Sequence, residues 1–290
     1  MATVYRALRD DEISEAVEVF LAGLGQYAVR MSLPAPTAYT PAAVQPLYRH
    51  LFDTGIFEVA EQDGRLVTVC AAVLRDDLCF LSMFWTRPEC LQRGLGKPLL
   101  ERVFEQARRR GARRFATWSS LDFAAVGTYL KLGLLPGGPI FTFEGPLKQP
   151  IEPPAAVQVR ELEPTTAATV DGVVRAARRP IDHPYFIARG ARGFQTEGAH
   201  GVTGYFYVNA GVIGPAAWLH PGDGESVLAC ALREAASDAP RVKLMFLGTN
   251  GPALRAAAAH GLRLVGTAHW LRSAPFGKLD QYLPSGPAVF

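Results

Sequence analysis

The stretch Cys90–Leu100, C-L-Q-R-G-L-G-K-P-L-L, lies between an apolar run and a long amphipathic segment. That order predicts a strand, a tight turn and a helix. The turn holds Gly94 and Gly96, flanked by Arg93 and Lys97. Glycine lets the backbone approach a ligand closely, and a helix start offers unpaired N–H groups and the positive end of the dipole. The stretch therefore predicts a site for an anion, most simply a phosphate or pyrophosphate.

The composition fits a folded protein of two medium-sized domains. The chain has 290 residues, of which 49% are hydrophobic and 20% charged, which is enough to bury a sizeable core. The formal net charge of +3 is too small to favour nucleic acid or a membrane surface as the main partner. We expect a protein that is a monomer or homodimer.

Cysteine, histidine and apolar patterns favour a cytoplasmic protein without a metal. The four cysteines show no C-x-x-C spacing, which predicts reduced, buried thiols. The six histidines show no H-x-x-x-H or H-x-E pattern, so we expect no metal site. The apolar runs are shorter than the roughly 20 residues of a membrane helix. The chain enters a strand-like pattern at once, so we expect no signal peptide.

Strands and helices alternate in the first half. The predicted strands span residues 3–8, 56–61, 66–74, 78–85, 113–119 and 140–144. The predicted helices span residues 10–27, 40–55, from the glycine turn to about 110, and 123–132. Asp63-Gly64 predicts a hairpin turn, Thr40-Pro41 a helix start and Gly133 a helix end.

A proline-rich stretch divides the chain. Residues 146–155, P-L-K-Q-P-I-E-P-P-A, hold four prolines and predict a stiff, extended linker. We therefore expect an N-terminal domain of residues 1–147, a linker of residues 148–154 and a C-terminal domain of residues 155–290.

After the linker the pattern begins again. Several later positions match at a constant offset: Gly94 plus 128 is Gly222, and Gly133 plus 128 is Gly261. The first strands are instead separated by 157 − 3 = 154, so the second copy is shorter by about 26 residues. We expect it to lack the loop and second helix of residues 31–55, and we interpret the two halves as a duplicated architecture.

The copies differ at the positions that carry chemistry. Pro221 and Glu225 stand where the first copy has Arg93 and Lys97, and an alanine stands where it has Tyr129. A pyrophosphate at the second turn would meet like charge. The differences predict one competent site, in the first half.

The first half resembles the GCN5-related N-acetyltransferase (GNAT) family. The resemblance rests on a strand, the turn Q-R-G-L-G-K, a helix, a strand and then D-F-A-A-V-G-T-Y-L-K-L-G-L at residues 122–134. It implies an α/β (α+β) fold with two tandem domains, each a mixed, mostly antiparallel sheet flanked by helices. It also implies acetyl-CoA as co-substrate, bound by Phe84, Trp85, Thr86, Gln92, Arg93, Gly94, Leu95, Gly96, Lys97 and Asp122.

Two positions depart from the family pattern. Leu91 stands where the family turn begins with glutamine or arginine, and Asp122 stands in place of an asparagine. Asp122 is also a good helix N-cap, so capping and contact with the cofactor both stay open for it.

The resemblance implies an N-acetyltransferase that moves an acetyl group from acetyl-CoA to an amine of a small molecule or peptide. Tyr129 matches the family's general acid, since a phenol with a pKa near 10 can protonate a leaving thiolate. A tyrosine of the core is the structural alternative. Strands 78–85 and 113–119 offer no carboxylate as base, so Glu58, Glu61 and a relay through water stay open.

Two other functions are compatible with the sequence. The absent carboxylate base and the altered second copy fit a non-catalytic acyl-CoA-binding or regulatory protein. A nucleotide-binding protein fits less well, because the turn lacks the third glycine of a dinucleotide site and the G-K-[ST] of a P-loop. For the acceptor, we expect a partly apolar pocket lined by aromatic side chains from Tyr27, Tyr39, Trp85 and Trp118.

Overall fold

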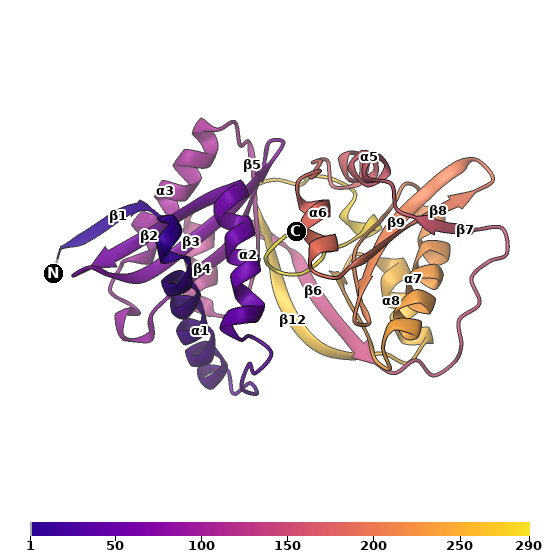
Figure 1. The fold of residues 1–290 in the computed structure, drawn as a ribbon, viewed down its shortest axis with the longest axis horizontal. Coiled ribbons are helices and arrows are strands. Elements are labelled where there is room, and N and C mark those ends of the chain that lie inside the picture. Colours follow the sequence, from indigo (N-terminus) through magenta and orange to yellow (C-terminus); the bar gives the residue numbers. More distant parts are fainter. Residues whose placement is uncertain (1) are drawn as a thin grey trace. The chain divides into compact units, whose positions relative to one another are not determined.

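The computed structural model describes residues 2–290, which form two compact units. The first unit contains the described residues up to Thr117 together with Asp122–Gly133. The second contains Trp118–Leu121 and Leu134–Phe290. Figure 1 shows the strands and helices of each unit along the chain.

The sheet of the first unit has the order β1-β2-β3-β4-β5. Its neighbouring strands are antiparallel, except that β4 and β5 are parallel. The strands are β1 (Thr3–Ala7), β2 (Gly55–Gln62), β3 (Arg65–Arg75), β4 (Leu78–Thr86) and β5 (Arg114–Ser119). The helices are α1 (Ile13–Arg30), α2 (Pro41–Thr54), α3 (Gly96–Arg109) and α4 (Phe123–Lys131). In Figure 1, α1 and α2 lie on one face of this sheet and α3 on the other.

The turns and helix ends predicted for the first half are confirmed. The Thr40 hydroxyl accepts a hydrogen bond from the N–H of Ala43 at 3.2 Å and caps α2. Asp63 and Gly64 both have positive φ, +51° and +76°, as a two-residue hairpin turn requires. Gly133 follows α4 with φ +83°, the left-handed conformation that ends a helix.

The sheet of the second unit has the order β12-β6-β11-β10-β9-β8-β7, and β13 pairs with β10. The strands are β6 (Leu135–Gly145), β7 (Gln158–Glu161), β8 (Arg192–Gly198), β9 (Gly201–Asn209), β10 (Val212–Trp218), β11 (Val242–Leu247), β12 (Arg263–Arg272) and β13 (Tyr282–Leu283). The helices are α5 (Pro164–Val174), α6 (Asp182–Ala188), α7 (Gly224–Asp238) and α8 (Gly251–Ala259).

Strand β9 shows how the second unit is layered. Successive side chains of a strand point to opposite faces. Phe206 and Val208 join a hydrophobic core formed with α7, α8, β10 and β11. Tyr205 and Tyr207 point the other way and contact side chains of α5 and α6. The sheet of this unit therefore has helices on both faces.

Both halves have the same order of elements, which supports the predicted duplication. The second helix that we expected the second copy to lack is present as α6, at half the length of α2. The prediction that this helix is missing was wrong because α6 is only 7 residues long and lies in a segment without clear periodicity. Strands β8 and β12 were also not predicted.

Strand β6 contains the segment 140–144 that we predicted to end the first half. It lies between β11 and β12 and pairs antiparallel with both. The compact units therefore do not coincide with residues 1–147 and 155–290. Whether residues 155–290 fold without β6 stays untested.

Three chemical expectations can be compared with the described residues. All four cysteines are free and buried, as predicted. Within residues 2–290, no helix combines the length and the apolar character that crossing a bilayer requires. No group of three or more His, Cys, Asp or Glu side chains in the same range is arranged to hold a metal ion.

Candidate active site

Strands β4 and β5 separate part of the way along the sheet. Their register pairs run from Leu78 to Leu81 on β4, and the Thr117 hydroxyl donates to the Leu81 carbonyl at 3.1 Å. Strand β4 continues to Thr86, paired on its other side with β3. Beyond Leu81, no register pair joins β4 to β5 within residues 2–290. This side of β4 carries Phe84, Trp85 and Thr86, and it offers backbone N–H and C=O groups to a ligand.

A bulge interrupts β4 at the point of separation. Ala71 pairs with Met83 and Ala72 with Leu81, so Ser82 is an extra residue on β4. A bulge turns the backbone locally and is common beside functional sites. The sequence analysis did not predict this bulge.

The glycine turn has the strained backbone that a ligand loop often shows. Gln92 and Gly94 have φ of +62° and +75°, a conformation that non-glycine residues seldom adopt. Helix α3 begins at Gly96. Arg93 and Lys97 are exposed, and the Lys97 ammonium lies 3.6 Å from the Glu101 carboxylate. Cations at a helix start oppose the dipole, so a bound anion explains their presence better than folding does.

Gly96 is required by packing as well. A Cβ atom on Gly96 would lie 2.6 Å from Cζ of Phe84, too close for any real contact. The ring of Phe84 also lies 6.2 Å from the ring of Tyr129, centroid to centroid. Phe84 thus contacts both the glycine turn and the candidate acid. The resemblance implied only that Phe84 binds the cofactor.

Tyr129 lies on α4 with a side chain that is 6% exposed. Burial raises the pKa of its phenol well above the ordinary value, and Cys70 and Asp122 raise it further. Within the described residues, no hydrogen bond fixes the Tyr129 hydroxyl. The phenol is therefore neutral at physiological pH and keeps a proton to donate.

Asp122 is the N-cap of α4. Its carboxylate accepts a hydrogen bond from the N–H of Ala124 at 2.9 Å, and it forms an ion pair with Arg30 at the end of α1. The capping role is thus confirmed. Contact between Asp122 and the cofactor stays a prediction.

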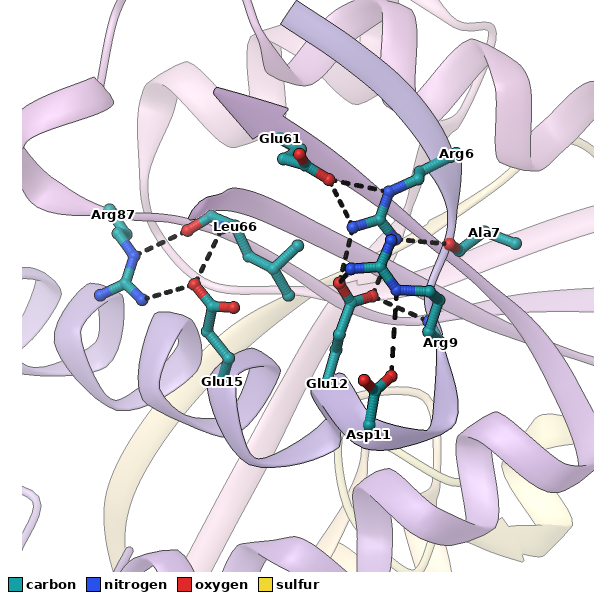
Figure 2. A network of polar contacts seen from close by, with 9 residues as sticks. All are labelled: Arg6, Ala7, Arg9, Asp11, Glu12, Glu15, Glu61, Leu66 and Arg87. Atoms are coloured by element: carbon teal, nitrogen blue, oxygen red, sulfur yellow. Dashed lines mark hydrogen bonds and ion pairs between the residues drawn. The ribbon is translucent and has the colours of Figure 1, made fainter. Parts of the chain in front are cut away.

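The two carboxylates considered as bases are both paired. Glu58 is 2% exposed, forms an ion pair with Arg102 and accepts a hydrogen bond from the Gln106 amide. Glu61 accepts a hydrogen bond from Nε of Arg6 at 2.9 Å, in the network drawn in Figure 2. Both carboxylates hold neighbouring elements together. A proton relay through water therefore fits the site better than either carboxylate acting as the base.

Aromatic side chains gather on the face of β4 opposite Phe84. The ring of Trp85 lies 5.2 Å from Phe20 and 6.5 Å from Tyr27, and Tyr39 lies 5.8 Å from Phe20. Three of the four aromatic residues expected near the acceptor thus form one cluster. The fourth, Trp118, belongs to the second unit.

Residues 28–134 match the sequence model of the acetyltransferase (GNAT) family. This segment contains the open edge of β4, the glycine turn and Tyr129, so the predicted resemblance of the first half is confirmed. None of the curated proteins compared matches the sequence.

The fold of the whole chain is that of tandem GNAT proteins. A structure from Pyrococcus horikoshii matches with a TM-score of 0.79 at 18% identity, covering 99% of this chain and 96% of that one. A tandem GNAT protein from the clavulanic acid biosynthesis pathway matches with a TM-score of 0.62 at 16% identity, covering 95% of this chain and 100% of that one. A GCN5-related N-acetyltransferase from Sphaerobacter thermophilus matches with a TM-score of 0.63 at 15% identity, covering 96% of this chain and 98% of that one. At such identities these matches establish the fold, as predicted.

Proposed function

We propose that the first unit is an N-acetyltransferase that moves an acetyl group from acetyl-CoA to an amine of a small molecule or peptide. The observation that carries this proposal is the open side of β4, which leads to the exposed, cationic glycine turn. Backbone groups of Phe84, Trp85 and Thr86 suit the amides of an extended pantetheine arm. The N–H groups at the start of α3, with Arg93 and Lys97, suit a pyrophosphate.

The groups around the end of β4 suit the steps of an acyl transfer. The backbone at the Ser82 bulge presents an N–H for the oxygen that becomes negative when the amine nitrogen bonds to the carbonyl carbon. Tyr129 donates its proton to the leaving sulfur as the carbon–sulfur bond breaks. The proton of the attacking nitrogen passes to water. Tyr129 is in its donor form at physiological pH, since the pKa of a phenol is ordinarily near 10 and burial raises it further.

Replacing Tyr129 by phenylalanine tests the proposal. We expect turnover to fall by about 100-fold or more, the usual range for a lost general acid, and the Kd for acetyl-CoA to stay within about twofold. Thiol release from acetyl-CoA with a panel of amines measures turnover, and the buried cysteines keep the background low. Tyr185→Phe, in the second unit, is the control and should leave turnover unchanged.

One outcome would count against the role of Tyr129 and another against the enzyme. If Tyr129→Phe retains full turnover, the phenol is a packing residue. If the parent protein binds acetyl-CoA but releases no thiol with any amine, a non-catalytic acyl-CoA-binding protein is the better description.

Replacing Gly96 by alanine tests the glycine turn. The new Cβ would clash with the Phe84 ring, so either this ring or the first residue of α3 must shift. We expect the affinity for acetyl-CoA to fall by about tenfold, or about 1.4 kcal/mol, as measured by calorimetry. Gly127→Ala is the control: it lies in α4 with nothing within 4 Å of the added atom and should leave affinity unchanged. Equal affinities for the two variants would contradict the assigned role.

A further inference from the structure

Strands β10 and β11 of the second unit separate as β4 and β5 do in the first. These two parallel strands pair at two positions: Val212 with Lys243 and Ile213 with Leu244. Strand β10 then continues to Trp218, past the end of its pairing with β11. The duplicated fold thus forms the same opening a second time.

In the second unit this opening is filled by the chain itself. Strand β13 runs antiparallel along β10, with Leu283 opposite Ala216 and Tyr282 opposite Ala217. Tyr282 and Leu283 are fully buried. In the first unit, within residues 2–290, no strand takes the corresponding side of β4 beyond Leu81. The two copies therefore differ in what occupies the opening as well as in the residues of the glycine turn.

Side chains of the second unit hold the inserted segment on both sides. The Gln281 amide donates to the Trp218 carbonyl of β10 at 2.8 Å. The Asn250 amide donates to the Tyr282 carbonyl at 3.2 Å, while its oxygen caps α8 by accepting from Ala253 at 3.0 Å. Asn250 is the counterpart of Asp122 in the 128-residue offset. The position that the resemblance assigns to the cofactor in the first copy thus binds a peptide strand in the second.

The residues that follow are anchored as firmly. The Arg175 guanidinium, itself 1% exposed, donates to the Phe290 carbonyl oxygen and to the Ala177 carbonyl at 2.7 Å. The Phe290 ring stacks on Trp270 at 4.5 Å between centroids. A segment buried this completely is part of the core of the unit.

The second glycine turn lacks both cations of the first copy. Pro221, which replaces the arginine of the first copy, has no N–H and no charge. Glu225 replaces the lysine and forms an ion pair with Arg255 at 3.1 Å. In the second unit, β13 occupies the side of β10 where the pantetheine arm of an acyl-CoA would bind. The second glycine turn lacks the cations that would bind its pyrophosphate.

From these contacts we infer that the groove between β10 and β11 is a strand-binding surface whose ligand is the segment Gln281–Leu283 of the same chain. The second unit is thereby held permanently in a ligand-bound form, and the protein binds one acyl-CoA. Only the identity of the ligand in the first unit rests on the proposed function; the strand pairing in the second does not.

Amide hydrogen exchange on the full chain, with and without acetyl-CoA, tests this inference. We expect the amides of Ala216–Trp218 and Tyr282–Leu283 to be protected in both conditions and unchanged by the ligand. The amides of Phe84–Thr86 should gain protection only when acetyl-CoA is added. Calorimetry should give one acetyl-CoA per chain.

The outcomes separate the inference from the proposed function. Rapid exchange at Ala216–Trp218 without ligand, new protection there with acetyl-CoA, or two sites per chain would overturn the inference. Unresponsive amides at Phe84–Thr86, with Ala216–Trp218 protected throughout, would count against acetyl-CoA in the first unit and leave the inference standing. Gln281→Ala should speed exchange at Tyr282–Leu283 by about tenfold without changing the Kd for acetyl-CoA; unchanged exchange would contradict the anchoring role.

Discussion

A chain of residues 155–290 will not form the folded second unit. It lacks β6, which lies between β11 and β12, pairs with β12 along nearly its whole length and pairs with β11 over Ile140–Gly145. Without β6, the two strands have unpaired edges facing each other, and exposed edges of this kind promote aggregation. We expect this fragment to be insoluble or to lack a cooperative thermal transition.

Side-chain packing points to the same result. Phe141 and Phe143 of β6 contact Phe246 of β11, at 6.4 and 5.5 Å between ring centroids. The fragment loses these contacts together with the backbone pairs, whereas a typical domain is stabilised by only roughly 5–15 kcal/mol.

The matched control is a chain of residues 134–290, which keeps β6. We expect this longer fragment to be soluble and to unfold cooperatively, as followed by circular dichroism. If the fragment 155–290 unfolds at the same temperature as 134–290, β6 is dispensable and the expected domain boundary is adequate as it stands.

Replacing Asp171 by asparagine will strongly destabilise the second unit. The Asp171 carboxylate is fully buried, lies 2.7 Å from Nε of Arg179 and accepts a hydrogen bond from the Tyr205 hydroxyl at 2.6 Å. His183 lies 3.3 Å away. The variant leaves the guanidinium of Arg179 buried without a counter-charge, which typically costs about 3–5 kcal/mol. Urea unfolding measures the loss, and Asp280→Asn, at an exposed position of the same unit, is the control.

The same substitution should change how stability depends on pH. Burial alone would raise the pKa of Asp171, but Arg179, His183 and Arg175 together lower it to about 2. A carboxyl whose pKa is lower in the folded state than in the unfolded state adds stability above the unfolded value, near 4. That stability is lost as the pH falls from about 4 to about 2. The parent should lose stability across this window more steeply than Asp171→Asn, and parallel curves would contradict the assignment.

The local features of the site could be predicted from the sequence, because each depends on neighbouring residues. The glycine turn, the cap at Asp122 and the helix end at Gly133 all follow from residue type and spacing. The open side of β4 could not be predicted, since it depends on where the pairing of β5 stops. The contact between Phe84 and Gly96 likewise requires the three-dimensional path of α3 over the sheet.

The pairing of strands whose partners are distant in sequence could not be predicted. The pattern of residues 140–144 identifies a strand, but its partners lie about 100 residues further on in β11 and about 120–130 residues further on in β12. Strand β13 has only two residues, too few for any periodic signal. Local patterns determine what an element is, whereas pairing over such separations determines where it goes.

The place of β6 also has a consequence for synthesis on the ribosome. Gly145 pairs with Val242, so β6 leaves the exit tunnel 242 − 145 = 97 residues before its first partner. At about 5–20 residues per second, the interval is about 5–20 s. During this time Phe141 and Phe143 have no native strand beside them in the second unit. The nascent chain therefore has to carry a strand of apolar character that cannot yet pair, and slower translation of residues 146–242 would prolong its exposure to chaperones.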